Sequence, residues 1–102
     1  MKTIRIDVGL NTAIKFKLQE KHFEGAKTVI FAIKNYLNED EYVVKREFSS
    51  AGEYVVVITP EESLKLKNCA KYGFGIRLYN EKDFRLTLNG GIELSRGVYS
   101  GD

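Results

Sequence analysis

Residues 53–66, with the sequence EYVVVITPEESLKL, limit the possible folds more than any other part of the chain. The stretch opens with five consecutive β-favouring residues, a run too apolar for a strand with one face in water. The next residues are typical of a helix N-terminus, because Thr59 can serve as the N-cap and Pro60 fits the first helical position. Thr59 and Glu62 also have the spacing of a capping box. We therefore expect a central strand that ends in a short helical turn near residues 60–67.

Most of the remaining chain alternates apolar and polar residues, which is the period of a β-strand. The clearest example is Ile14, Phe16 and Leu18, which alternate with two lysines. Similar segments, separated by turn-forming residues, recur at intervals of about ten residues. They predict an all-β fold, an immunoglobulin-like antiparallel β-sandwich of seven or eight strands with one short helical turn. The expected strands lie near residues 4–8, 14–18, 28–33, 42–48, 53–58, 72–79, 84–88 and 92–94.

The turns between these segments predict how some strands pair. Residues 49–52 would join two strands in an antiparallel hairpin, and residues 80–83 would join two more. Gly90 and Gly91 predict a break or a bulge in the last strand. The inward faces predict one core that contains Ile14, Phe16, Phe31, Val56, Phe74, Ile76 and Leu86.

Length and charge set the class of protein. The chain has 102 residues, which suits a single β-sandwich domain over residues 1–98 with a tail or linker at 99–102. Sixteen basic and 14 acidic residues give a net charge of +2, too balanced for a nucleic-acid or anionic-membrane partner. No apolar run approaches the ~20 residues of a membrane span, and the first ten residues lack a signal peptide's apolar core.

The sequence shows no combination of residues that predicts catalysis. His22 lies in a polar loop and is expected to be solvated, and the adjacent Glu61 and Glu62 would not face each other on a helix. Cys69 is the single cysteine, which excludes an internal disulfide, and we expect it to be a small buried residue. We therefore expect no enzyme activity, no metal and no cofactor.

The strand over residues 72–79 carries the candidate interface. Gly73 and Gly75 would leave its outer face bare, so that another backbone or sheet could approach closely. Arg77 follows in the same alternation, and Tyr79 would flank the bare surface as an amphipathic anchor. These residues predict self-association or docking at a strand edge, and a plain monomer is the alternative.

Several motifs together resemble a known family. They are Gly25-Ala26-x-x-Val29-x-Phe31-x-Ile33, the strand that runs into Ile58-Thr59-Pro60-Glu61, Lys71-Tyr72-x-Phe74-x-Ile76-x-Leu78 and Gly91-Ile92-x-Leu94. Over residues 10–98 the chain resembles the immunoglobulin-like N-terminal domain of phage baseplate upper proteins, and related tail-fibre-associated domains of Gram-positive phages and prophages. The resemblance implies a non-enzymatic structural module of the virion tail, assembled in the bacterial cytoplasm. It would dock fibre or receptor-binding components through protein–protein contacts, as a homo-oligomer.

A generic immunoglobulin-like binding domain is the alternative, with carbohydrate bound through exposed tyrosines. Tyr36, Tyr42, Tyr79 and Tyr99 are the candidates. A groove lined by exposed aromatic side chains would favour the sugar-binding domain. A flat apolar patch or an unpaired strand edge would favour the assembly module.

Overall fold

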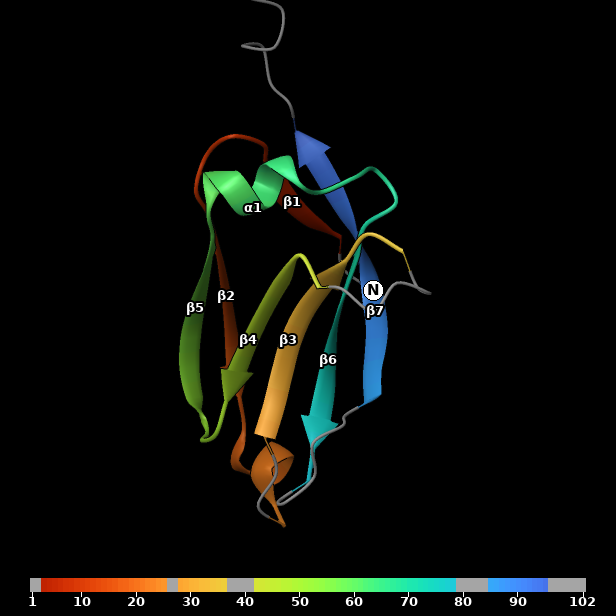
Figure 1. The fold of residues 1–102 in the computed structure, drawn as a ribbon. Helices are drawn as coiled ribbons and strands as arrows, with labels where there is room; N and C mark the ends of the chain where they lie inside the picture. Colours follow the sequence, from red (N-terminus) through yellow and green to blue (C-terminus); the bar gives the residue numbers. More distant parts are fainter. Residues whose placement is uncertain (1–2, 26–27, 37–41, 79–84, 96–102) are drawn as a thin grey trace, which may run out of the picture.

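The computed structural model describes residues 3–25, 28–36, 42–78 and 85–95, with the backbone alone at 85–89. Within these ranges the fold is mostly β, as the alternating pattern predicts (Figure 1). The elements in chain order are β1 (Ile4–Asp7), β2 (Thr12–Leu18), the 3-10 helix η1 (Glu20–Phe23), β3 (Thr28–Lys34), β4 (Val44–Phe48), β5 (Gly52–Ile58), α1 (Pro60–Leu64), β6 (Lys71–Arg77) and β7 (Arg85–Ser95).

The strands form two sheets of unequal width. One sheet has five strands in the order β1-β7-β6-β3-β4, and the other has two strands, β2 and β5. The pairs within them are antiparallel except β1–β7, which is parallel from Ile4 opposite Ile92 to Asp7 opposite Ser95. The expectation of a wholly antiparallel fold is therefore wrong. β1 and β7 are far apart in the sequence, so no hairpin turn dictates their relative direction.

One of the two predicted hairpins forms. β6 and β7 pair antiparallel, and the register shifts where Tyr72 is opposite Gly90 and Gly73 is opposite Leu88. Asn89 is the extra residue on β7, so the irregularity expected at Gly90 and Gly91 is confirmed as a bulge.

The other predicted hairpin, between β4 and β5, is wrong. β4 pairs with β3 and β5 pairs with β2, so the link between them crosses from one sheet to the other. Alternation alone could not distinguish the two cases. Both strands turn apolar residues toward the same core, Val44 from β4 and Val56 from β5, whether they pair or lie in facing sheets.

The core lies between the two sheets. Its buried cluster comprises Ile6, Phe31, Ile33, Val44, Val56, Ile58, Leu66, Ala70, Tyr72 and Ile92. Among the predicted core residues, Phe31 and Val56 are buried, and Ile14, Phe16 and Phe74 are partly buried against the cluster. Ile76 is 46% exposed, which corrects its assignment to the core, because the two-stranded sheet does not cover it. The side chain of Leu86 lies outside the described part of the chain.

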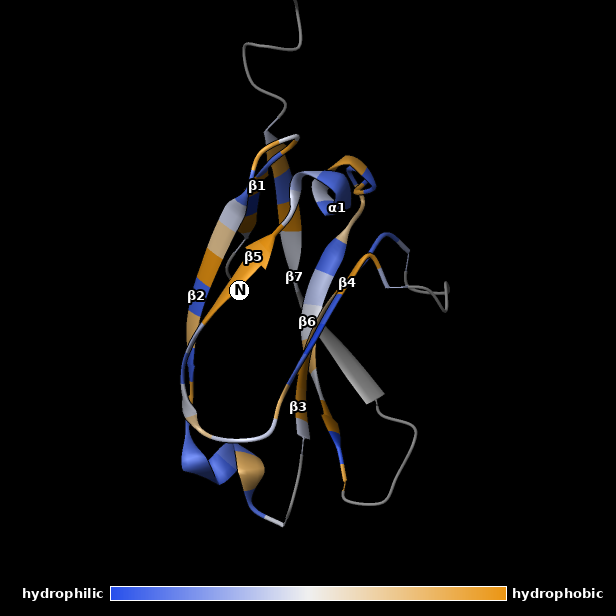
Figure 2. Ribbon diagram, turned by 60° about the vertical axis from the view of Figure 1, so that its left-hand side comes forward, coloured by the Kyte–Doolittle hydropathy of each residue, from blue (hydrophilic) through white to orange (hydrophobic). Residues whose placement is uncertain are grey.

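β5 is not the central strand that its composition predicts. It pairs with β2 alone among the described strands, and this narrow sheet stands apart from the larger one (Figure 2). Val56 and Ile58 face the core, whereas Val55 and Val57 are 55% and 44% exposed. The apolar run therefore serves one buried face and leaves one apolar face in solvent.

Candidate functional site

The corner between β5 and α1 has the capping chemistry that the sequence predicts. Thr59 Oγ1 accepts a hydrogen bond from the backbone N–H of Glu62 at 3.1 Å, and Glu62 Oε1 accepts one from the N–H of Thr59 at 3.0 Å. Pro60 occupies the first turn of the helix. The capping box satisfies two backbone donors that a helix start would leave unpaired, so this corner ends β5 sharply.

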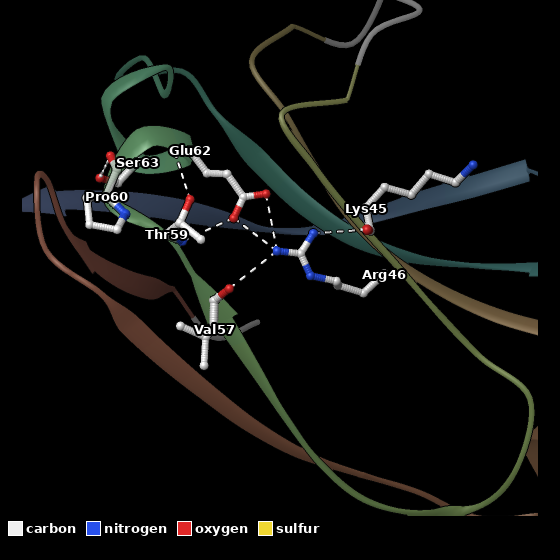
Figure 3. Close-up of polar contacts among 7 residues, drawn as sticks. All are labelled: Lys45, Arg46, Val57, Thr59, Pro60, Glu62 and Ser63. Carbon is white, nitrogen blue, oxygen red and sulfur yellow. Dashed lines mark hydrogen bonds and ion pairs between the residues drawn. The ribbon is translucent and has the colours of Figure 1, made fainter.

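Arg46, on β4, joins the corner to the five-stranded sheet (Figure 3). Its Nη2 donates to Glu62 Oε1 at 2.9 Å, to Glu62 Oε2 at 3.2 Å and to the carbonyl oxygen of Val57 at 3.3 Å. Partial burial raises the pKa of Glu62, but the hydrogen bonds from Thr59 and Arg46 and the charge of Arg46 outweigh it. The pKa of Glu62 therefore lies below its ordinary value, and the carboxylate serves as a structural anion.

Two further polar residues tie α1 and the segment after it to the rest of the fold. Ser63 is fully buried; its Oγ accepts from the N–H of Gly9 at 2.8 Å and donates to the carbonyl oxygen of Pro60 at 2.7 Å. Asn35 is 8% exposed; its Nδ2 donates to the carbonyl oxygen of Lys65 and its Oδ1 accepts from the N–H of Lys67, both at 2.9 Å. Nothing in the sequence around Asn35 marks this role, which only the tertiary fold creates.

The residues considered for catalysis lie apart from one another. His22 Nδ1 accepts a hydrogen bond from the N–H of Gln19 at 2.9 Å within η1, a helical turn that the sequence did not predict in this loop. Cys69 is exposed, so its expected burial is wrong. Its neighbours on either side of the turn before β6, Leu66 and Ala70, occupy the buried positions instead. Across the part of the chain that the structure describes, no group of three or more His, Cys, Asp or Glu side chains could hold a metal ion.

The predicted interface on β6 has a different setting from the expected one. β6 lies between β3 and β7, and both Gly73 and Gly75 are buried, so the expected bare outer surface is wrong. Arg77, which is opposite Thr28 on β3, forms an ion pair with Glu47 on β4. Glu47 is in turn opposite Ile30 on β3, so this ion pair joins β6 and β4 across the strand between them. Tyr79 lies outside the described residues. A role of this strand in an interface stays a prediction.

Two exposed apolar side chains lie on the outer face of the two-stranded sheet. Val55 and Val57 share its outer face with Ala13, which is opposite Val57, and with Lys15, which is opposite Val55. The outer face therefore carries three apolar residues next to the exposed Lys15 and Lys17.

A hollow also runs between the two sheets beside β2. It consists of adjoining parts of about 370 Å³ and 340 Å³, and Phe16 and Phe74 line both of them. Leu18, Val29 and Ile76 line the first part, and Ile4, Ile14, Phe31 and Tyr72 line the second. We refer to this hollow as the β2–β6 groove. Its walls are mainly apolar, and its charged lining residues are Lys15 and Lys17.

The described tyrosines do not form a shared binding platform. Tyr36 is 40% exposed and its ring lies 4.9 Å from Lys67 Nζ, whereas the ring of Tyr42 lies 5.0 Å from Lys34 Nζ. Tyr54 packs on Phe48, and its hydroxyl donates to the carbonyl oxygen of Ser50. Tyr79 and Tyr99 lie outside the described residues. Neither Tyr36 nor Tyr42 lines the β2–β6 groove.

In the described ranges, no helix has both the length and the apolar character needed to cross a membrane. Comparison with protein-family models, curated proteins and solved structures gives no match to this chain.

Proposed function

We propose that the chain is a non-enzymatic docking module with an immunoglobulin-like β-sandwich fold, which acts through protein–protein contacts. The observation that carries the proposal is the apolar outer face of the two-stranded sheet, where Val55 and Val57 are 55% and 44% exposed. The two-stranded sheet packs on the core through its inner face, including Val56 and Ile58, and its outer face is exposed. A partner that covers this face would bury apolar area and stabilise the pair of strands at the same time.

The resemblance of residues 10–98 to baseplate upper proteins supports a setting for this docking. The module would belong to a phage or prophage tail, where it would join fibre or receptor-binding components to the baseplate. Copies of the chain would associate as a homo-oligomer, assembled in the bacterial cytoplasm and carried in the virion. The balanced charge supports protein partners over nucleic acid or membrane.

The polar groups support a structural role over catalysis. Glu62, Arg46, Ser63 and Asn35 are engaged in capping and in joining elements of the fold. The carbohydrate-binding alternative has less support, because Tyr72 is the described tyrosine that lines the β2–β6 groove and is only 8% exposed, whereas the exposed Tyr36 does not line it.

Sedimentation velocity over a range of concentrations tests the proposal. The weight-average mass of the chain should rise toward a homo-oligomer at tens of micromolar. The double substitution Val55→Lys and Val57→Lys should abolish the rise, because it places charge in the buried centre of the contact. Leu64→Lys is the matched control, since Leu64 is 65% exposed on α1, away from this face, and should leave the rise intact.

A chain that stays monomeric at every concentration, and that also fails to bind co-expressed tail proteins of the same phage or prophage, would overturn the proposal. So would an oligomer that forms equally well with lysine at both valine positions in a folded variant.

A further inference from the structure

β2 has one edge that no described strand pairs with. Its other edge pairs with β5 from Thr12 opposite Ile58 to Leu18 opposite Gly52. The β2–β6 groove lies along the unpaired edge, because its lining residues come from β2, the five-stranded sheet and His22 of η1, and none comes from β5. The fold thus places unpaired backbone N–H and C=O groups beside an apolar groove.

This arrangement is suited to the addition of a strand. A strand paired with β2 would turn alternate side chains inward, beside Phe16 and over Phe74 and Ile76, the last of which is 46% exposed. Backbone hydrogen bonds along the edge would supply affinity, and the groove would select the inward side chains. A strand added at this edge would therefore need apolar inward residues.

The charges beside the edge select the outward residues of the occupant. Lys15 and Lys17 alternate with the inward residues of β2 and are exposed. Neither takes part in the described ion pairs, and Glu53 is the acidic residue opposite Lys17 on the β5 side. On the unpaired side, acidic residues of an added strand would lie directly beside these lysines, where opposite charges stabilise cross-strand pairs.

The same charges disfavour a second copy of β2 as the occupant. An antiparallel β2–β2 pair would place lysine next to lysine on the shared outer face, and like charges opposite each other destabilise such a pair. We propose that the unpaired edge of β2 receives an extended segment of a partner protein in which apolar and acidic residues alternate. This inference rests on the proposed docking function and names the chemistry of its partner.

The experiment uses the whole chain and a fluorescent peptide with the seven-residue length of β2, in which valine alternates with glutamate. Fluorescence anisotropy should show saturable binding that weakens as salt is added. Ile76→Ser should weaken binding about tenfold or more, because it removes an apolar wall residue. Leu64→Ser is the matched control on α1 and should bind as the unaltered chain does.

Reversing the charges of Lys15 and Lys17 distinguishes specific recognition of an acidic strand from non-specific binding of the peptide. The double substitution Lys15→Glu and Lys17→Glu should weaken binding of the glutamate peptide about tenfold and should favour a matched peptide in which lysine replaces glutamate. The control is the double substitution of Lys65 and Lys67 by glutamate, which changes the net charge by the same amount. It should leave the preference for the glutamate peptide over the lysine peptide unchanged. Amide hydrogen exchange along β2 should slow when the glutamate peptide is bound, because an added strand protects the edge.

The outcomes distinguish this inference from the broader function. Absence of saturable binding, or binding insensitive to both Ile76→Ser and the charge reversal, overturns the acidic-strand inference. If the chain still self-associates through Val55 and Val57, the docking function is retained while the inference fails. If Ile76→Ser instead abolishes self-association, a second copy occupies the groove and the inference is likewise overturned.

Discussion

The bridge between Arg46 and Glu62 offers the sharpest test of how the two sheets are held together. We expect Arg46→Ala and Glu62→Ala, combined in a double-mutant cycle, to give a coupling energy of about 1 kcal/mol. Hydrogen bonds to charged groups contribute roughly 1.5–3 kcal/mol and exposed ion pairs about 0.2–1 kcal/mol. The side chains of Arg46 and Glu62 are 34% and 21% exposed, which places this pair between the two classes.

The cycle isolates the bridge from the other contacts of both residues. Glu62→Ala also removes the hydrogen bond to the N–H of Thr59, but that loss occurs in the single and the double variant and cancels. The matched control is the cycle between Lys45 and Glu47, which lie 3.8 Å apart with both side chains 39% exposed. Its coupling should stay below about 0.5 kcal/mol.

Urea unfolding, followed by circular dichroism, supplies the four free energies of unfolding in each cycle. A coupling for Arg46 and Glu62 that is no larger than the control would refute the reasoning. It would show that the contacts of Figure 3 add nothing beyond a solvent-exposed ion pair.

The pH dependence of the same bridge has a defined sign. The pKa of Glu62 in the folded chain lies below its ordinary value of 4.5, so the carboxylate stabilises the fold fully above that value. This contribution should be lost as the pH falls through the lowered folded pKa. The difference in unfolding free energy between the unaltered chain and Glu62→Gln should therefore be constant near neutral pH and shrink below about 4.5. A difference that grows on acidification would contradict the assignment.

Four other substitutions probe the framework by denaturant titration. Thr59→Ala should cost about 1 kcal/mol through the lost cap and leave partner affinity unchanged after correction for stability, and a large binding loss in a folded variant would contradict this. Asn35→Ala should cost about 1–3 kcal/mol, because the N–H of Lys67 and the carbonyl oxygen of Lys65 lose their partner; a loss within error would contradict the bridging role. Phe31→Ala should cost about 3–5 kcal/mol and Ile76→Ala less than about 1 kcal/mol, and equal costs would show that Ile76 is buried after all.

Local chemistry in the sequence predicted the local structure well. The start of α1 follows from Thr59, Pro60 and Glu62, whose interactions span only a few residues. The inward faces of β2 and β4 also follow from alternation, and the bulge follows from the glycine pair at Gly90 and Gly91. These features depend on neighbours along the chain, which a sequence displays directly.

Features that depend on strand partners could not be predicted in the same way. The apolar run in β5 suggested burial on both faces, yet Val55 and Val57 are 55% and 44% exposed, because the core packs on the opposite face of this sheet. Gly73 and Gly75 suggested a strand with a bare outer face, but both residues are buried on the inner strand β6. The sequence could not distinguish these cases, since glycine fits a buried inner strand as well as an exposed one. The β2–β6 groove could not be predicted either, because its position depends on which edge of β2 has no strand partner in the described fold.

The parallel pairing of β1 and β7 determines how the fold would bear a mechanical load. Tension applied before Ile4 and after Ser95 would pull on opposite ends of this pair, which runs in register from Ile4 opposite Ile92 to Asp7 opposite Ser95. The strands would then slide along each other, so their hydrogen bonds would be strained together. By contrast, a hairpin that is pulled apart at its open end breaks its hydrogen bonds one at a time. The pairing therefore resists tension in shear, and its rupture would release β1 from the edge of the larger sheet in a single step.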